Sequence, residues 1–591
     1  MWSRRALAAA ALATILSCPA GAQIEDSALE QVDPWGVGYL TEDEPAFRTR
    51  MWRGTPGESL LPLVQAARTQ GLTPGERMLL RRLALSPARA PAGEASHALL
   101  AERARLAFEL GEAKSAAGQF SRLPPPPEAL TEDGAEHAEP APPPPMDPAA
   151  MAADLNLVLG NEATACDAVS APHLEGTYWA KLRAVCAALA GNTSGAELAM
   201  EMAQAQGVKD SWLAAAIFAT SGATPNPPRA KFDTGLEYAM SARAMLEMTP
   251  DMLPEERPDI AAALARQKLT PPAVRVRAAS IAAEAGLITA DEYRIAYNSA
   301  LAADGFAPTT ALDRAIFVSS DALSTNAEKA EALATALKAT AGEPARFDAV
   351  SGLLQFGIAR LPVDAETEAQ AILFARAAIA AGDLAEAARW IAPPEPEEPV
   401  IAVSAETPAG PETEPPDGAP ENLLPAELPE EPEVEPPPPE PELPSFDVAW
   451  LQALMVLADP EPEAATIEET ARTLMAIAES RSEKRTAARL FALWTIGGTA
   501  PPAAARAWLA EESETAAKNP GPGKALAVLA AARSGTAAEV VVSTLALTDG
   551  DPSKLETSDL AILAAALEDV GAGDAARQLA LEASGYWKAR K

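Results

Sequence analysis

Chemically reactive side chains are scarce in this sequence of 591 residues, which contains three cysteines and three histidines. The histidines, His97, His137 and His173, lie in separate regions and match no metal-binding spacing such as H-E-x-x-H. The sequence also lacks the G-x-x-x-x-G-K-[ST] phosphate loop, the G-x-G-x-x-G dinucleotide pattern and the G-x-S-x-G nucleophile turn. We therefore predict a protein without enzymatic activity and without a cofactor or metal ion.

Aromatic and β-branched side chains are also few. Aromatics make up 5% of the chain, and the 48% of hydrophobic residues is mostly alanine, with leucine second. Alanine is the best helix former and lets helices approach closely. Because valine, isoleucine and tyrosine favour strands and are sparse here, a sheet protein is excluded and an all-α fold is expected.

Positive charge is in short supply, since 47 Lys and Arg face 83 Asp and Glu, for a formal net charge of -36. No stripe rich in Lys and Arg is present, so nucleic acid is not expected as a partner. An acidic surface also disfavours adsorption to anionic lipid.

Two proline-rich, acidic stretches divide the chain, at residues 124–148 and 393–445. The stretch from Pro393 to Pro444 contains 18 prolines, 15 Asp or Glu and no Lys, Arg or His. Proline has no backbone N–H, and uncompensated charges resist burial. Both stretches are therefore predicted to be disordered linkers between three folded modules, at residues 23–123, 149–392 and 446–591.

The N-terminus has the three parts of a secretory signal peptide. Arg4 and Arg5 precede an apolar run from Ala6 to Leu16, and an A-x-A site predicts cleavage of residues 1–22, between Ala22 and Gln23. We expect a periplasmic or secreted protein.

Long hydrophobic runs are missing after this segment, so no stable membrane insertion is expected. An alternative is a lipoprotein signal with Cys18 as the lipidated residue. The A-x-A site explains the same stretch better, because bulky Leu16 stands where a lipoprotein signal usually has a small residue.

The two remaining cysteines, Cys166 and Cys186, are predicted to form a disulfide, as expected for an isolated pair in an exported chain. Helices are expected over 154–168 and 178–190, and an antiparallel hairpin would bring the two cysteines to similar heights. Two buried free thiols are the alternative. A metal site would need more ligands than the nearby His173 supplies.

Alanine-rich helix pairs separated by glycine turns recur after residue 149, and several turns are 36 to 40 residues apart. These turns are expected at Gly191, Gly305, Gly342, Gly382, Gly497, Gly535 and Gly571. Such a period is typical of an α-solenoid built from helix-turn-helix pairs. In the N-terminal module, Trp35 and Trp52 are expected to dock the polar arm, and Thr73 with Glu76 predicts a capped helix start.

RAAIAAGDLAEAARWI (376–391) resembles a tetratricopeptide-type repeat, with a small-residue helix, a Gly-Asp turn and paired alanines. The phrases MWRGT (51–55), YWAKLRAVCAALAGN (178–192) and AAEAGLITADEYRIAY (282–297) resemble exported, alanine-rich helical-repeat proteins of alphaproteobacteria, some of which carry an antifreeze label. This resemblance implies a helical repeat and export, and it implies no activity.

These observations predict a scaffold that binds a protein or peptide partner in the cell envelope. The alternatives are a cell-wall-associated enzyme or accessory subunit, and a mechanical envelope spacer. The adjacent Glu479 and Ser480 resemble the catalytic Glu-Ser pair of soluble lytic transglycosylases, but the stretch that follows that pair in the family is absent. We therefore expect both side chains to lie on a helix surface.

Overall fold

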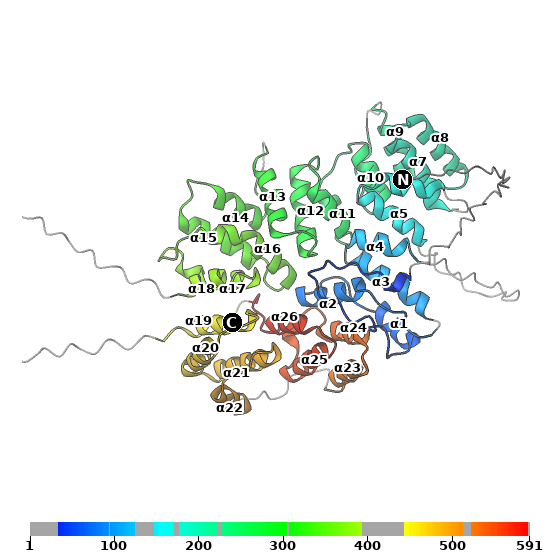
Figure 1. Ribbon diagram of the computed structural model, residues 1–591. Coiled ribbons are helices and arrows are strands. Elements are labelled where there is room, and N and C mark those ends of the chain that lie inside the picture. The colour runs from blue at the N-terminus through cyan, green and yellow to red at the C-terminus, as the bar shows by residue number, and fades with distance from the viewer. Residues whose placement is uncertain are drawn as a thin grey trace, which may run out of the picture.

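In the computed structural model the chain is helical throughout its described parts (Figure 1). The described residues are 33–93, 95–123, 147–170, 176–222, 226–303, 307–392, 443–511 and 522–588. Within these ranges the chain forms 26 α-helices and no β-strand, which confirms the predicted all-α class. The predicted signal peptide, its cleavage site at Ala22 and Gln23, Cys18 and most of both predicted linkers lie outside the described residues.

The N-terminal segment contributes four helices and an ordered arm. The helices are α1 (Gly57–Gln65), α2 (Pro74–Leu85), α3 (Ser96–Glu109) and α4 (Ala113–Phe120). As predicted, Thr73 and Glu76 form a reciprocal capping box at the start of α2. Trp35 and Trp52 are both buried and meet edge to face at 5.5 Å between ring centroids, so they anchor the arm.

The central segment contributes fourteen helices. These are α5 (Pro148–Val158), α6 (Glu162–Asp167), α7 (Thr177–Leu189), α8 (Thr193–Ala205), α9 (Ser211–Ala219), α10 (Gly235–Arg243), α11 (Pro258–Arg266), α12 (Pro272–Glu284), α13 (Ala290–Leu301), α14 (Ala311–Ser320), α15 (Asn326–Lys338), α16 (Pro344–Ile358), α17 (Ala371–Ala380) and α18 (Leu384–Ile391). The single helix expected over 154–168 is interrupted, because Gly160 adopts a φ of +74° between α5 and α6. Asp147 caps α5, so the helix begins inside the stretch predicted as linker.

The C-terminal segment contributes eight helices. These are α19 (Phe446–Ala458), α20 (Ala464–Ile477), α21 (Arg481–Ile496), α22 (Ala503–Glu511), α23 (Pro522–Ser534), α24 (Ala537–Thr548), α25 (Thr557–Asp569) and α26 (Gly573–Ala583). Glu479 and Ser480 are exposed, and Ser480 is the N-cap of α21 in a capping box with Glu483. Ser480 therefore stabilises a helix start. Both residues are exposed as predicted, but they lie just before α21 and not on a helix.

Neighbouring helices pack in sequence order, as in a solenoid. The closest such pairs include α7 with α8, α11 with α12, α14 with α15, and α17 with α18. Five predicted turn glycines have a φ between +76° and +101°, a region open to glycine: Gly191, Gly342, Gly382, Gly535 and Gly571. The prediction for Gly497 was one residue off, because Gly498 takes the positive φ of +88°. Gly305 lies outside the described residues.

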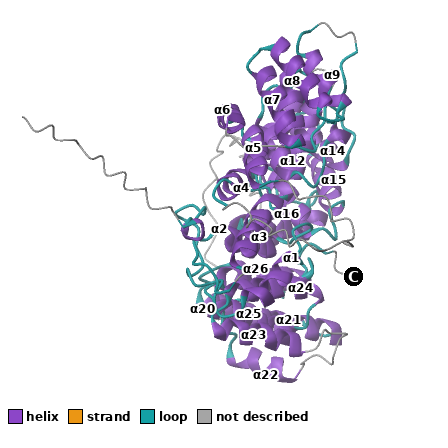
Figure 2. Ribbon diagram, turned by 90° about the vertical axis from the view of Figure 1, so that its right-hand side faces the viewer, coloured by secondary structure: helices purple, strands orange, loops and turns teal. Residues whose placement is uncertain are grey.

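The helices follow a closed circuit (Figure 1). From α1 the chain runs through α4 and α5 and on to α18, then continues in α19, which packs against α17 and α18. The C-terminal helices lead back to the beginning, where α26 packs against α2 and α24 against α1 and α2. Buried apolar side chains from all three segments form one continuous core. Figure 2 shows the same helices from the side, with α1, α3 and α26 midway along the molecule.

Candidate functional site

The circuit closes where α2 meets α26, and polar side chains join both ends of this helix pair. Glu582, in the last turn of α26, accepts hydrogen bonds from the Thr73 hydroxyl at 2.5 Å and from the Gly75 N–H at 2.7 Å. The carboxyl group thus lies at the N-terminus of α2, where the helix dipole favours negative charge. At the other end, Arg82 of α2 binds Asp574 at 3.0 Å and the Gly571 carbonyl at 2.9 Å.

Burial makes this closure sensitive to protonation. Glu582 is fully buried, and this burial raises the pKa of its carboxyl group to about 7 despite the hydrogen bonds from Thr73 and Gly75. Glu76 lies nearby in the first turn of α2 and adds a repulsion that raises the same pKa. The junction therefore contains a carboxyl group that titrates near neutral pH.

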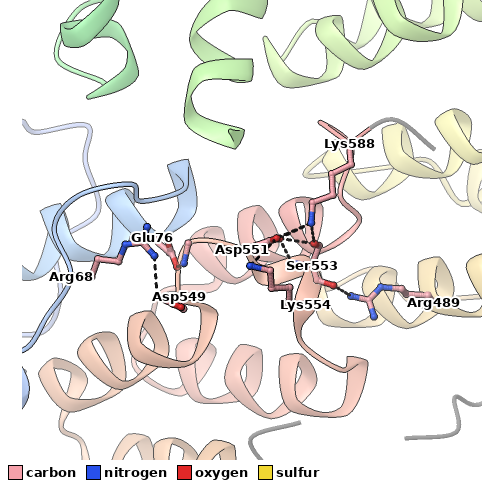
Figure 3. Close-up of polar contacts among 9 residues, drawn as sticks. Arg68, Glu76, Arg489, Asp549, Asp551, Ser553, Lys554 and Lys588 are labelled. Carbon is pink, nitrogen blue, oxygen red and sulfur yellow. Dashed lines mark hydrogen bonds and ion pairs between the residues drawn. The ribbon is translucent and has the colours of Figure 1, made fainter. Parts of the chain in front are cut away.

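The turn between α24 and α25 is the second polar connection at the junction (Figure 3). On one side, Glu76 accepts hydrogen bonds from the Thr548 hydroxyl and from the Gly550 N–H, the latter at 2.9 Å. Arg68, in the loop before α2, forms an ion pair with Asp549 at 3.0 Å. These contacts fasten the N-terminal segment to the turn.

The opposite side of the turn binds the C-terminal segment to itself (Figure 3). Lys588 donates to both carboxylate oxygens of Asp551, at 3.0 and 2.8 Å, and Arg489 of α21 donates to the Ser553 carbonyl at 3.3 Å. The backbone of Lys588 in turn accepts a hydrogen bond of 2.6 Å from Arg376 of α17. All three segments are therefore linked through this region by charged side chains.

A cleft lies beside this junction, between α2, α12, α16 and α26. Its volume is about 900 Å³, and a second cavity of about 410 Å³ adjoins it. Both are lined by Arg77, Glu284 and Ala345, so we treat them as one site and call it the junction cleft. The larger part is lined by residues of all three segments, among them Met78 of α2, Asp348 of α16 and Gln578 of α26.

Arg77 holds two walls of the junction cleft together. Its guanidinium group donates to the carbonyls of Ala285 at 2.7 Å and Glu284 at 3.2 Å, at the C-terminal end of α12. Burial lowers the pKa of Arg77 to about 10, which leaves it charged at neutral pH. A cation at a helix C-terminus also complements the helix dipole.

Two carboxyl groups in the junction cleft have raised pKa values. Burial raises the pKa of Asp348 well above its usual value, and the Tyr586 hydroxyl donates to both of its oxygens, at 2.7 and 2.9 Å. Burial also raises the pKa of Glu284, which lies 3.7 Å from Arg346. Carboxyl groups with perturbed pKa values in a cleft are typical of functional sites.

Acidic groups outnumber basic ones in the larger cavity. Its charged lining consists of Arg77, Arg81, Arg82, Glu44, Glu112, Glu284, Asp348 and Asp574. Arg81 is paired with Glu44 and Glu112, and Arg82 with Asp574. The cleft can therefore accept an additional positive charge more readily than a negative one.

The predicted disulfide is present and lies outside the junction cleft. Cys166 of α6 and Cys186 of α7 are joined, with their Cα atoms 5.6 Å apart, and the bond ties α6 to α7. A disulfide fits an oxidising compartment.

Two further properties of the described residues concern membranes and metal ions. No helix there combines the length and the apolar character needed to span a bilayer. No group of three or more His, Cys, Asp or Glu side chains there is placed to hold a metal ion.

Reasoning from the sequence missed the residues that join α2 to α26 and those that line the junction cleft. Glu582 and Asp348 occur in ordinary helical sequence, and their partners Thr73 and Tyr586 are hundreds of residues away from them. The capping box of Thr73 and Glu76 was a signal for a helix start only.

No family model, curated protein or solved structure matches the chain.

Proposed function

We propose that the protein is an exported helical-repeat scaffold without catalytic activity, and that the junction cleft binds an extended segment of a protein partner. The observation that carries the proposal is the pair of adjoining cavities lined by helices of all three segments. A groove between stacked helices is a typical place for a solenoid to bind a peptide. Export rests on the N-terminal sequence and is consistent with the disulfide.

The charge of the cleft indicates what the bound segment carries. Asp348 is held by a neutral hydroxyl group, and no basic side chain pairs with it among the described contacts. A Lys or Arg of the partner placed beside Asp348 would lower the pKa of this carboxyl group and keep it ionised. We therefore expect a basic side chain at the centre of the bound segment.

Site-specific photocrosslinking in the native envelope tests this proposal. A photoreactive amino acid replaces Met78, which lines the cleft and is 38% exposed, and in a matched control it replaces Met245, which is 85% exposed and is not part of the cleft. We expect one stoichiometric protein adduct from position 78 and none from position 245. Equal adducts from both positions, or no adduct from position 78, would refute the proposal.

A cell-wall-associated enzyme is the second candidate, because Asp348 provides a carboxyl group with a raised pKa in the cleft. The test is the release of soluble fragments from purified peptidoglycan by the purified protein and by its Asp348→Asn variant. Release by the wild type and its loss in the variant would favour the enzyme over the scaffold.

The envelope spacer remains the third candidate. Deletion of Pro393–Pro444 distinguishes the spacer hypothesis from the scaffold hypothesis. The function of a spacer would depend on that stretch, whereas the junction cleft contains none of its residues. Adduct formation at position 78 that survives the deletion supports the scaffold.

A further inference from the structure

A second groove, separate from the junction cleft, lies between α13, α14, α15 and α16. Its volume is about 410 Å³. The floor is apolar and includes Leu301, Ile316, Leu333, Leu353, Leu354 and Leu361. We call it the α13–α16 groove. It shares no lining residue with the junction cleft.

Cationic side chains surround an exposed aromatic ring in this groove. Phe356 of α16 is 56% exposed, and the guanidinium carbons of Arg294 and Arg360 each lie 5.2 Å from the centre of its ring. Lys329 of α15 adds a third positive charge to the lining. An exposed aromatic ring between cations is suited to a ligand that is both acidic and apolar.

The positive charge of the groove is only partly compensated. Arg294 pairs with Asp291 at 2.9 Å, but neither Arg360 nor Lys329 makes an ion pair within the described residues. The single carboxylate in the lining belongs to Asp321, which accepts hydrogen bonds from the Leu323 N–H and the Ser324 hydroxyl. The groove is thus locally cationic on a chain whose formal net charge is -36.

We propose that the α13–α16 groove binds the acidic, proline-rich segment of this same chain, residues 393–442. This segment contains only acidic charges, and carboxylates form strong, often bidentate hydrogen bonds with guanidinium groups. Proline-rich segments are already extended before they bind, so they lose little conformational entropy on binding. They typically bind grooves that expose aromatic rings. The composition of the segment therefore matches both features of the groove.

The course of the chain supports this occupant. Arg389 of α18 donates to the carbonyls of Leu361 at 3.0 Å and Ile358 at 3.3 Å, and Leu361 lines the groove. The described chain stops at Ala392, one turn after Arg389, and resumes at Leu443 before α19, which packs against α18. The start of the segment is thus held near the groove, which raises the effective concentration of the segment there.

Zero-length carbodiimide crosslinking of the full-length protein tests the location of the segment. This reagent joins a lysine amine to a carboxyl group in direct contact. We expect crosslinks from Lys329 to Asp or Glu of residues 393–442, and we expect none from Lys209, an exposed lysine on the loop before α9. A mixture of isotopically light and heavy protein shows whether each crosslink is within one chain. Crosslinks only between chains, or equally frequent ones from Lys209, would overturn the proposal.

A binding measurement tests the role of the groove charges. A synthetic peptide of residues 393–442 is titrated into full-length protein in which this segment is replaced by a Gly/Ser linker of equal length. We expect binding that weakens with salt, and a loss of about tenfold or more in affinity in the double variant Lys329→Glu/Arg360→Glu. Lys209→Glu is the matched control and should bind like the parent. Thermal melting verifies that each variant is folded, and equal affinity in all variants would contradict the proposal.

Discussion

Glu582 illustrates how much a single residue contributes to the closure of the circuit. Its carboxyl group binds the N-terminus of α2 from a position 509 residues further along the chain, and it is fully buried. Burial of an acid favours the neutral form, so this residue connects the stability of the fold to pH.

We predict that the protein is more stable at pH 5 than at pH 8, and that Glu582→Gln reduces this difference. The pKa of Glu582 is about 7 in the folded protein against an ordinary 4.5, so between these values the folded state binds a proton that the unfolded state has released. The stabilisation is therefore complete below pH 4.5 and is lost as the pH rises through 7, by roughly 3 kcal/mol in total. Thermal melting at both pH values measures it.

The matched control for this prediction is Glu479→Gln, which removes a carboxylate that is exposed at the start of α21. It should leave the pH dependence as in the wild type. Asp348 and Glu284 also have raised pKa values, so they too make the protein more stable at pH 5 than at pH 8. The stability difference between the two pH values should therefore shrink in Glu582→Gln without disappearing. An unchanged difference in Glu582→Gln would contradict the role of this residue.

Gly235 provides a second prediction at the residue scale. It begins α10 at the point where Asp154 of α5 accepts hydrogen bonds from the Gly235 and Leu236 N–H groups, at 2.7 and 3.1 Å. A Cβ atom at position 235 would lie 2.0 Å from the Asp154 carbonyl oxygen, so the helices would have to separate. We expect Gly235→Ala to reduce the unfolding free energy by about 2 kcal/mol or more.

Chemical denaturation of Gly235→Ala beside Gly523→Ala checks this expectation. Gly523 lies in the first turn of α23, and a Cβ atom at this position would have no neighbour within 4 Å, so alanine there should be neutral or slightly stabilising. Similar stabilities of the two variants would show that α5 and α10 can adjust to the added methyl group.

At the scale of the element, the disulfide between Cys166 and Cys186 holds α6 against α7. It closes a loop with a sequence separation of 20 residues, so in the chain-entropy model it stabilises the fold by roughly 3 kcal/mol. We predict that Cys166→Ser/Cys186→Ser melts at a lower temperature, with the largest rise in hydrogen exchange in α6. The melting temperature of the variant should also be unaffected by a reducing agent, which should lower that of the wild type. Unchanged exchange in α6 would show that packing alone holds this helix.

Helices with local signals were predictable from the sequence, because the information lies within a few residues. Thr289 and Glu292 form the expected capping box of α13, as Thr73 and Glu76 do for α2. The break after α5 was missed although its signal is local, because Gly160 takes a positive φ of +74° and the Asn161 N–H donates to the Asn156 carbonyl at 2.8 Å, as at a helix C-cap.

At the scale of the whole molecule, the closure of the circuit could not be predicted. The periodicity of α2 and α26 predicts helices with buried faces, but it contains no information on which helix covers which. The polar pairs at the junction, such as Arg82 with Asp574, join single residues separated by 492 positions. The same is true of the junction cleft, which exists only because helices from all three segments surround it.

Closure leads to a prediction about the covalent continuity of the chain. A protease recognition site placed within residues 393–442 and then cut should leave two fragments that stay associated, because α19 packs against α17 and α18 while α26 and α24 pack against α2. Size-exclusion chromatography should show one peak containing both fragments. The same cut in the Arg82→Ala/Glu582→Ala variant should weaken the association, and separate elution of the wild-type fragments would disprove the closure.

The pairing of α2 with α26 also determines when the protein can finish folding. Thr73 is synthesised well before its partner Glu582, which lies 509 residues further along the chain. The N-terminal helices must therefore persist with an uncovered apolar face until α26 has been made, and contacts this distant in sequence form slowly. The pairing of α2 with α26 is thus a late step of folding, which the helices of all the intervening sequence precede.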